Sequence, residues 1–151
     1  MRIVSHTCSN TEIVCALGAG RQLVGVDDDS DHPADVVAPL PKLGRDLELD
    51  VARVAALRPD LVLTSLTVPG HERIVEALRQ AGLPVLVIDP IGLDGVYDSI
   101  AQVAEALGML KRDDQQSSEI LLALAGAARL LRPASLRLRP VTASRLRRRR
   151  H

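Results

Sequence analysis

Aromatic side chains are almost missing from this chain of 151 residues, which has one tyrosine, Tyr97, and neither phenylalanine nor tryptophan. An aliphatic core is therefore expected, and functions that depend on stacking aromatic rings are nearly excluded. Two cysteines are too few for a disulfide scaffold. No apolar run approaches the roughly 20 residues that cross a bilayer. The amino-terminal apolar run is too short for a signal peptide, so the chain as written would be cytoplasmic.

Acidic residues stop at Glu119, although the formal net charge of the whole chain is zero. Residues 1–125 contain 19 acidic and 10 basic side chains, whereas residues 126–151 contain nine arginines and no acid. A basic arm can attract nucleic acid or a membrane. This one lacks aromatic residues, so its one means of binding nucleic acid would be attraction to the phosphates. We expect a disordered tail, or the out-of-frame or truncated end of a longer gene, and no nucleic-acid partner.

Short aliphatic runs alternate with helical patterns along residues 1–112. The runs are continuously apolar, which indicates a mostly parallel sheet of about five strands with helices on both faces. Strands are predicted at residues 2–5, 23–26, 42–44, 61–64 and 85–88, and helices after Ser9, Asp50, Pro69 and Asp94.

Two of these helices have capping signals. Ser9-Asn10-Thr11-Glu12 fits a capping box, in which the Ser9 hydroxyl accepts from the Glu12 amide and the Glu12 carboxylate from the Ser9 amide. Asp50 is predicted to cap the helix that follows it.

Parallel strands joined by right-handed crossovers bring their carboxyl ends to one edge, where open α/β sheets bind ligands. The loops expected at this edge are residues 6–10, 27–33, 44–48, 65–70 and 89–92.

Three groups of side chains in these loops could carry chemistry. Cys8 precedes a helix, where amide groups stabilise a thiolate, and His6 is nearby, but no third residue orients such a nucleophilic pair. The run 27–31 holds four aspartates before His32, yet it lacks the glycine and closing glutamate of a calcium loop. We therefore expect a solvated acidic loop and no metal site. His71 is predicted to face solvent or to cap a helix.

Eight short sequence segments, here called strings, follow one another in the same order as in one known family. Together they resemble the amino-terminal lobe of the cobalamin and iron–siderophore substrate-binding proteins of ABC importers, over about residues 2–125. The strings are Ile3-Val4-Ser5, Ser9-Asn10-Thr11-Glu12-Ile13, Ala16-Leu17-Gly18-Ala19-Gly20, Leu23-Val24-Gly25-Val26, Asp31-His32-Pro33, Leu40-Pro41-Lys42-Leu43-Gly44, Ala56-Leu57-Arg58-Pro59-Asp60-Leu61-Val62-Leu63 and Gly82-Leu83-Pro84-Val85-Leu86-Val87-Ile88-Asp89.

Members of that family have two α/β lobes joined by one long helix, with the ligand between the lobes. The resemblance implies a three-layer Rossmann-like lobe at residues 1–112, the start of the connecting helix at 113–132 and an Arg-rich tail at 133–151. It also implies a non-enzymatic solute-binding component of an ABC importer, or a truncated remnant of one, for an iron–siderophore or related metal chelate. No cofactor is implied, and the ligand-binding residues would be His6, Thr7, Cys8, Ser9, Asp29, Arg45 and Ser65.

The sequence departs from that family in three respects. The family is periplasmic or cell-surface, but no signal peptide is evident here. Its cobalamin binders stack the corrin on aromatics at positions that correspond to Asp29, Asp46 and Ser65, so cobalamin is disfavoured. The glutamate that docks on the permease corresponds to Ala52, with Glu48 nearby but out of register.

Three alternatives about partners and function stay open. An ABC permease would be a partner if a second lobe is supplied, and an exposed lobe face could favour self-association. The chain could instead be a non-transporting, degenerate paralogue. The least favoured alternative is a small α/β enzyme that uses Cys8.

Overall fold

The computed structural model describes residues 1–109, so the predicted connecting helix at 113–132 and the tail at 133–151 lie outside the described residues. The elements are β1 (Ile3–Ser5), α1 (Cys8–Ala16), the 3-10 helix η1 (Gly20–Gln22), β2 (Leu23–Val26), α2 (Ala34–Val37), the 3-10 helix η2 (Asp46–Glu48), α3 (Val51–Ala56), β3 (Leu61–Ser65), α4 (His71–Gln80), β4 (Val85–Ile88) and α5 (Gly92–Ala106).

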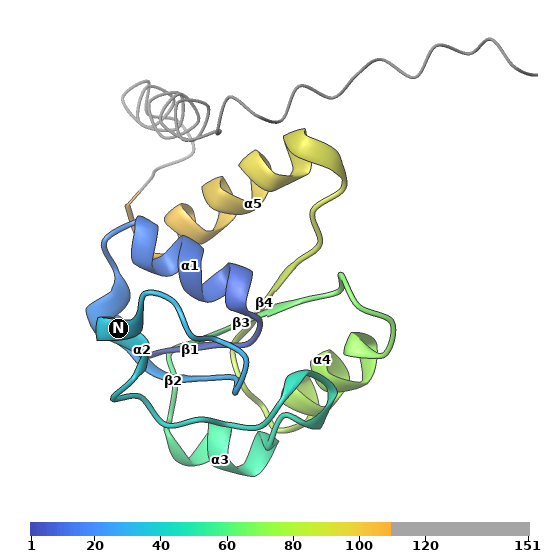
Figure 1. Ribbon diagram of the computed structural model, residues 1–151. Helices are drawn as coiled ribbons and strands as arrows, with labels where there is room; N and C mark the ends of the chain where they lie inside the picture. The colour runs from blue at the N-terminus through green and yellow to red at the C-terminus, as the bar shows by residue number, and fades with distance from the viewer. Residues whose placement is uncertain (110–151) are drawn as a thin grey trace, which may run out of the picture.

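The four strands form one parallel sheet in the order β2-β1-β3-β4. Helices α1 and α5 lie on one face and helices α3 and α4 on the other, which makes three layers (Figure 1). The predicted α/β lobe with a parallel sheet is therefore confirmed. The fifth predicted strand, at residues 42–44, is reduced to a single bridge between Val26 and Lys42. The segment stays beside β2, because the Asp28 amide donates to the Gly44 carbonyl at 3.0 Å, but it forms no further strand pairing.

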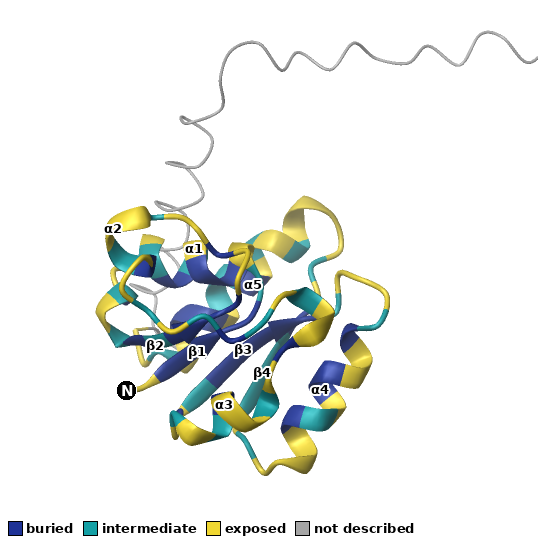
Figure 2. Ribbon diagram, turned by 60° about the horizontal axis from the view of Figure 1, so that its bottom comes forward, coloured by how far each residue is buried: buried dark blue, intermediate teal, exposed yellow. Residues whose placement is uncertain are grey.

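Neighbouring strand residues face opposite sides of the sheet, and this alternation divides the core in two. Ile3 and Leu63 belong to the cluster that packs under α1 and α5, with Val14 and Val103. Val4 and Val62 belong to the opposite cluster, with helix residues such as Leu78. Figure 2 shows the buried positions gathered in the strands and on the helix faces that meet them. The sheet needs apolar residues at consecutive positions because both of its faces are covered.

The capping predictions had different outcomes. The Asp50 side chain accepts a hydrogen bond from the Arg53 amide at 3.0 Å, so the predicted cap of α3 is confirmed. The capping box at Ser9 is wrong, because α1 already begins at Cys8 with Thr7 as its N-cap, and Thr7 makes no side-chain cap bond. The predicted capping residues therefore lie within the first turns of the helix.

None of the helices within residues 1–109 has the length and apolar character that a membrane crossing requires.

Candidate functional site

A hollow of about 230 Å³ lies at the carboxyl edge of the sheet. It is formed by the turns after β1, β2 and β3, together with the segment that contains η2. Four of the five predicted edge loops therefore converge, and the fifth, at residues 89–92, contributes no lining residue. We refer to this cavity of about 230 Å³ as the edge hollow. Its lining residues are Thr7, Cys8, Ser9, Asp27, Asp29, Asp46, Thr67, Val68 and His71.

The buried Asp27 carboxylate fixes the two turns that follow β1 and β2. Its Oδ2 accepts hydrogen bonds from the Thr7 amide at 2.9 Å and the Ser30 hydroxyl at 2.7 Å. Its Oδ1 accepts from the Asp29 amide at 2.9 Å. Asp27 is 1% exposed, so these bonds replace the water that the carboxylate gives up. They also hold Thr7 at a φ of 86°, a region that a β-branched residue rarely occupies.

Ser65 lies beneath the edge hollow and supports its wall. It is 2% exposed, and its hydroxyl accepts a hydrogen bond from the Asn10 amide group at 3.1 Å. The same hydroxyl lies 3.3 Å from the Thr7 hydroxyl. Ser65 therefore positions the turn after β1, whereas Thr7, Cys8 and Ser9 line the hollow directly.

Arg45 and Asp29 form an ion pair at the rim, with Nε 3.1 Å from Oδ1. Their side chains are 72% and 46% exposed, so water screens the pair and little free energy opposes its separation. Either group can therefore turn to an incoming ligand at small cost. Arg45 is absent from the lining of the hollow and stands beside it.

Two buried histidines meet beside the hollow, which His71 lines and His6 does not. His6 and His71 are both 0% exposed, and their rings lie 5.0 Å apart in an edge-to-face arrangement. His71 Nε2 lies 2.6 Å from Asp46 Oδ1, while His6 Nε2 lies 2.9 Å from the Asp46 carbonyl oxygen. His6 Nδ1 lies 2.8 Å from the Thr64 hydroxyl. We name these three residues the His6–Asp46–His71 cluster.

Burial lowers the pKa of His6, because the charged imidazolium would lose its water, and nearby His71 acts in the same direction. The hydrogen bond to the Asp46 carbonyl opposes this shift, as do the charges of Asp27 and Asp46. His6 is therefore held neutral to a lower pH than a free histidine.

The prediction that His71 faces solvent or caps a helix is wrong. It begins α4, but its ring is packed against His6 and covered by the segment that carries Asp46. The partners are 25 and more positions away in the sequence, so no local pattern could have revealed the cluster.

The Cys8–His6 pair considered from the sequence does not form, because both ring nitrogens of His6 are engaged by Thr64 and Asp46. Cys8 is exposed and lines the edge hollow. Burial raises the pKa of the other thiol, Cys15, and the nearby carboxylates of Asp35 and Glu12 add to the shift.

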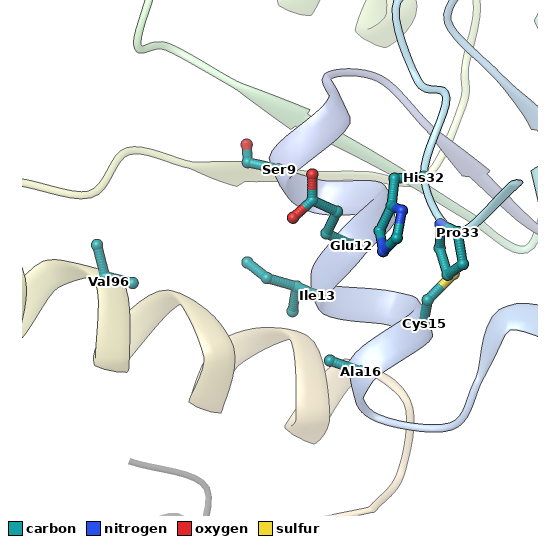
Figure 3. Close-up of a pocket in the computed structure, with 8 residues that line it drawn as sticks. All are labelled: Ser9, Glu12, Ile13, Cys15, Ala16, His32, Pro33 and Val96. Atoms are coloured by element: carbon teal, nitrogen blue, oxygen red, sulfur yellow. The ribbon is translucent and has the colours of Figure 1, made fainter. Parts of the chain in front are cut away.

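A second, larger opening of about 530 Å³ lies between α1 and α5 (Figure 3). Apolar side chains from both helices face it, and His32 and Pro33 close one side (Figure 3). It shares Ser9 with the edge hollow, but none of the His6–Asp46–His71 cluster lines it. Its lining residues are Ser9, Glu12, Ile13, Cys15, Ala16, His32, Pro33 and Val96.

Comparisons with known proteins agree on one family. The family model described as "Periplasmic binding protein" matches residues 3–134. An uncharacterized ABC transporter substrate-binding lipoprotein, YvrC of Bacillus subtilis, is 38% identical over 116 residues, covering 76% of this chain and 36% of that protein. A vitamin B12-binding protein of Yersinia pestis is 30% identical over 104 residues, covering 69% of this chain and 36% of that protein.

Solved structures show the same relationship. A periplasmic heme-binding protein from Pseudomonas aeruginosa superposes with a TM-score of 0.68 at 29% identity, covering 85% of this chain and 44% of that one. The chain thus spans about a third of the length of the curated relatives it matches. The matched family is one of binding proteins, which confirms the prediction that the chain is not an enzyme. This chain belongs to the periplasmic binding protein family.

Proposed function

We propose that this chain is a solute-binding lobe of an ABC importer, and that its ligand is an iron–siderophore or related metal chelate. The observation that carries the proposal is the convergence of three strand ends on the edge hollow, where hydroxyl and carboxylate groups stand beside an exposed guanidinium. Open parallel sheets bind their ligands at this edge. The names of its relatives, which include vitamin B12-binding and heme-binding proteins, support a metal chelate as the class of ligand.

The lining of the hollow favours a polar chelate over a flat macrocycle. None of its lining residues is phenylalanine, tyrosine or tryptophan, the imidazole of His71 is buried, and the chain's one tyrosine lies elsewhere, in α5. Corrin and porphyrin rings are held largely by apolar and aromatic contact area, which this wall does not supply. Thr7 and Ser9 offer hydroxyl groups, and Arg45 can meet an anionic oxygen of a siderophore in a directed, bidentate way.

A lobe of this kind forms one wall of a cleft, so a second lobe is part of the proposal. Exposed aliphatic side chains near the carboxyl edge support this, because Ile91 is 84% exposed and Leu93 53%. Leu47 and Val68 add exposed apolar area on the segments that border the hollow. We propose that these residues face the second lobe, and that the two lobes together engage an ABC permease. We also propose that the exposed apolar residues let this chain self-associate. Light scattering tests the self-association, and a clean monomer contradicts it.

Isothermal titration of the whole chain tests the ligand. The probes are a ferric hydroxamate siderophore, a ferric catecholate siderophore, heme and cobalamin. We expect a siderophore to bind and cobalamin to bind more weakly or not at all. Arg45→Ala should weaken siderophore binding by roughly tenfold or more, the loss expected for a charged hydrogen bond. Arg79→Ala is the matched control, because Arg79 is exposed in the last turn of α4.

Two results would contradict the proposal. If none of the four probes binds at high micromolar concentration, the chain has the fold of a receptor without its function, as a degenerate paralogue would. If cobalamin or heme binds more tightly than both siderophores, the argument from the lining residues is wrong.

A further inference from the structure

The His6–Asp46–His71 cluster brings three metal-binding groups to one place. One ligand atom from each residue lies within 4.8 Å of the other two. Both histidines are fully buried, whereas the Asp46 side chain is 41% exposed. We propose that this cluster binds a late first-row divalent cation, with Zn²⁺ as the representative ion. The inference does not depend on the proposed function, because it concerns the bare cation.

The identity of the donor atoms decides the class of metal. Two imidazole nitrogens and one carboxylate oxygen suit Zn²⁺, Co²⁺ and Ni²⁺, whereas Mg²⁺ and Ca²⁺ prefer sites made of oxygen atoms alone. Asp27 and Asp29 line the same hollow and add negative charge that attracts a cation.

Hydrogen bonding within the cluster leaves one buried nitrogen unused. His71 Nδ1 has no hydrogen-bond partner among the described residues, although its ring is 0% exposed. Buried polar atoms in folded proteins are nearly always paired, and an unpaired one is a common sign of a bound ion or water. This observation is independent of the distances within the cluster and indicates that the protein's own side chains do not complete it.

The surroundings of His6 suit a metal ligand. Its Nδ1 lies 2.8 Å from the Thr64 hydroxyl, which is itself fully buried. In this structure Nε2 donates to the Asp46 carbonyl oxygen at 2.9 Å, and a metal bound to Nε2 would replace that bond. Nδ1 would then carry the proton and donate it to Thr64, an arrangement that fixes the ring in metal sites. Thr64 is therefore a positioning residue for the site.

The position of the cluster leaves room for a fourth ligand. Asp46 and His71 both line the edge hollow, so a cation that replaces their 2.6 Å hydrogen bond would face the hollow on one side. Sites with three protein ligands and one open position accept water or a donor atom from a bound molecule. A donor group of a solute could thus complete the coordination.

The test uses the full, tag-free chain with Co²⁺ as a spectroscopic probe and Zn²⁺ in calorimetric titration. We expect one cation per chain and a visible Co²⁺ spectrum that Zn²⁺ abolishes. Asp46→Asn keeps the backbone carbonyl that holds His6 and removes the anionic ligand, and it should weaken binding by more than tenfold. His71→Asn should do the same. The matched control is His32→Asn, since His32 is exposed and outside the cluster.

The Thr64→Val variant distinguishes a metal site from a hydrogen-bond network that serves the structure alone. It should weaken Zn²⁺ binding by about 10-fold or more, the loss typical when a group that orients a ligand is removed. Added Zn²⁺ should raise the melting temperature of the unmodified chain and leave that of Asp46→Asn unchanged, because only bound metal stabilises the folded state. Far-UV circular dichroism shows whether each variant is folded.

Several results would overturn the inference. The first is that the chain binds neither Zn²⁺ nor Co²⁺. The second is that folded Asp46→Asn and His71→Asn variants bind the metal as tightly as the unmodified chain. The third is that His32→Asn loses as much metal affinity as they do. A thiolate-to-cobalt absorption band would place the metal at a cysteine instead. The siderophore titrations use iron already held in its chelate, so failure of either proposal leaves the other standing.

Discussion

Replacing Asp27 by asparagine perturbs the group that joins the turns after β1 and β2. The carboxylate accepts three hydrogen bonds, from the Thr7 amide, the Ser30 hydroxyl and the Asp29 amide. Asparagine has the same shape but only one accepting oxygen. If that oxygen keeps the two bonds made by Oδ2, the new amide group faces the Asp29 N–H, and two donors then oppose each other.

The expected cost follows from these contacts. A hydrogen bond to a charged group contributes about 1.5–3 kcal/mol, and a buried donor left without an acceptor costs about 1–3 kcal/mol. The two bonds that remain also lose their charged acceptor. We expect Asp27→Asn to lower the free energy of unfolding by roughly 2–4 kcal/mol.

Urea denaturation followed by far-UV circular dichroism measures this change, since the chain has no tryptophan to report by fluorescence. With an m-value of about 2 kcal/mol/M, the midpoint should fall by about 1–2 M. Asp31→Asn is the control, because Asp31 is exposed in the same loop and should change stability by less than about 0.5 kcal/mol. A midpoint for Asp27→Asn equal to that of the control would refute the reasoning.

Three further predictions concern single positions. Gly44→Ala should cost roughly 2–4 kcal/mol in urea denaturation, because φ is 106° and a Cβ would lie 2.3 Å from a backbone oxygen, whereas Gly18→Ala, at φ 77° in open space, should cost only about 1 kcal/mol. Equal losses would contradict the steric argument. Asp50→Ala removes the cap of α3 and should lower the free energy of unfolding by about 1 kcal/mol. An unchanged free energy of unfolding would show that the cap does not stabilise the fold. Iodoacetamide alkylates the thiolate, so the alkylation rate of Cys15, followed by peptide mass spectrometry, should increase only at a higher pH than the alkylation rate of an ordinary thiol. At neutral pH, Cys15 should be alkylated more slowly than exposed Cys8. Faster reaction at Cys15 would contradict the raised pKa.

Continuous aliphatic runs predicted the sheet well, because a strand covered on both faces must be apolar at every position. The predicted ranges 23–26 and 85–88 coincide with β2 and β4. The run at 42–44 is Lys-Leu-Gly, which is less apolar than the other predicted strands, and only Lys42 forms a bridge, with the edge strand β2. A charged residue and a glycine in a run of three are a weak signal for a strand that is covered on both faces.

The N-terminus of α1 shows why local signals can fail. Ser9 and Glu12 satisfy the capping-box pattern, but the Asp27 carboxylate, 20 positions from Thr7, accepts from the Thr7 amide and fixes the turn, so that the N-cap lies two residues earlier than predicted. A side chain from a distant loop therefore overrides a signal within four residues. Asp50 met no such competitor, and its predicted cap formed.

Periodicity and composition determined the class of fold, the shared edge of the sheet and the loops that gather there, because these depend on which residues must avoid water. Only the tertiary structure decided which polar groups meet. The His6–Asp46–His71 cluster joins segments separated by 40 and 25 positions, and its geometry depends on how η2 folds over the end of β1 and the start of α4. Distances between such segments depend on chain packing, which no local pattern in the sequence records.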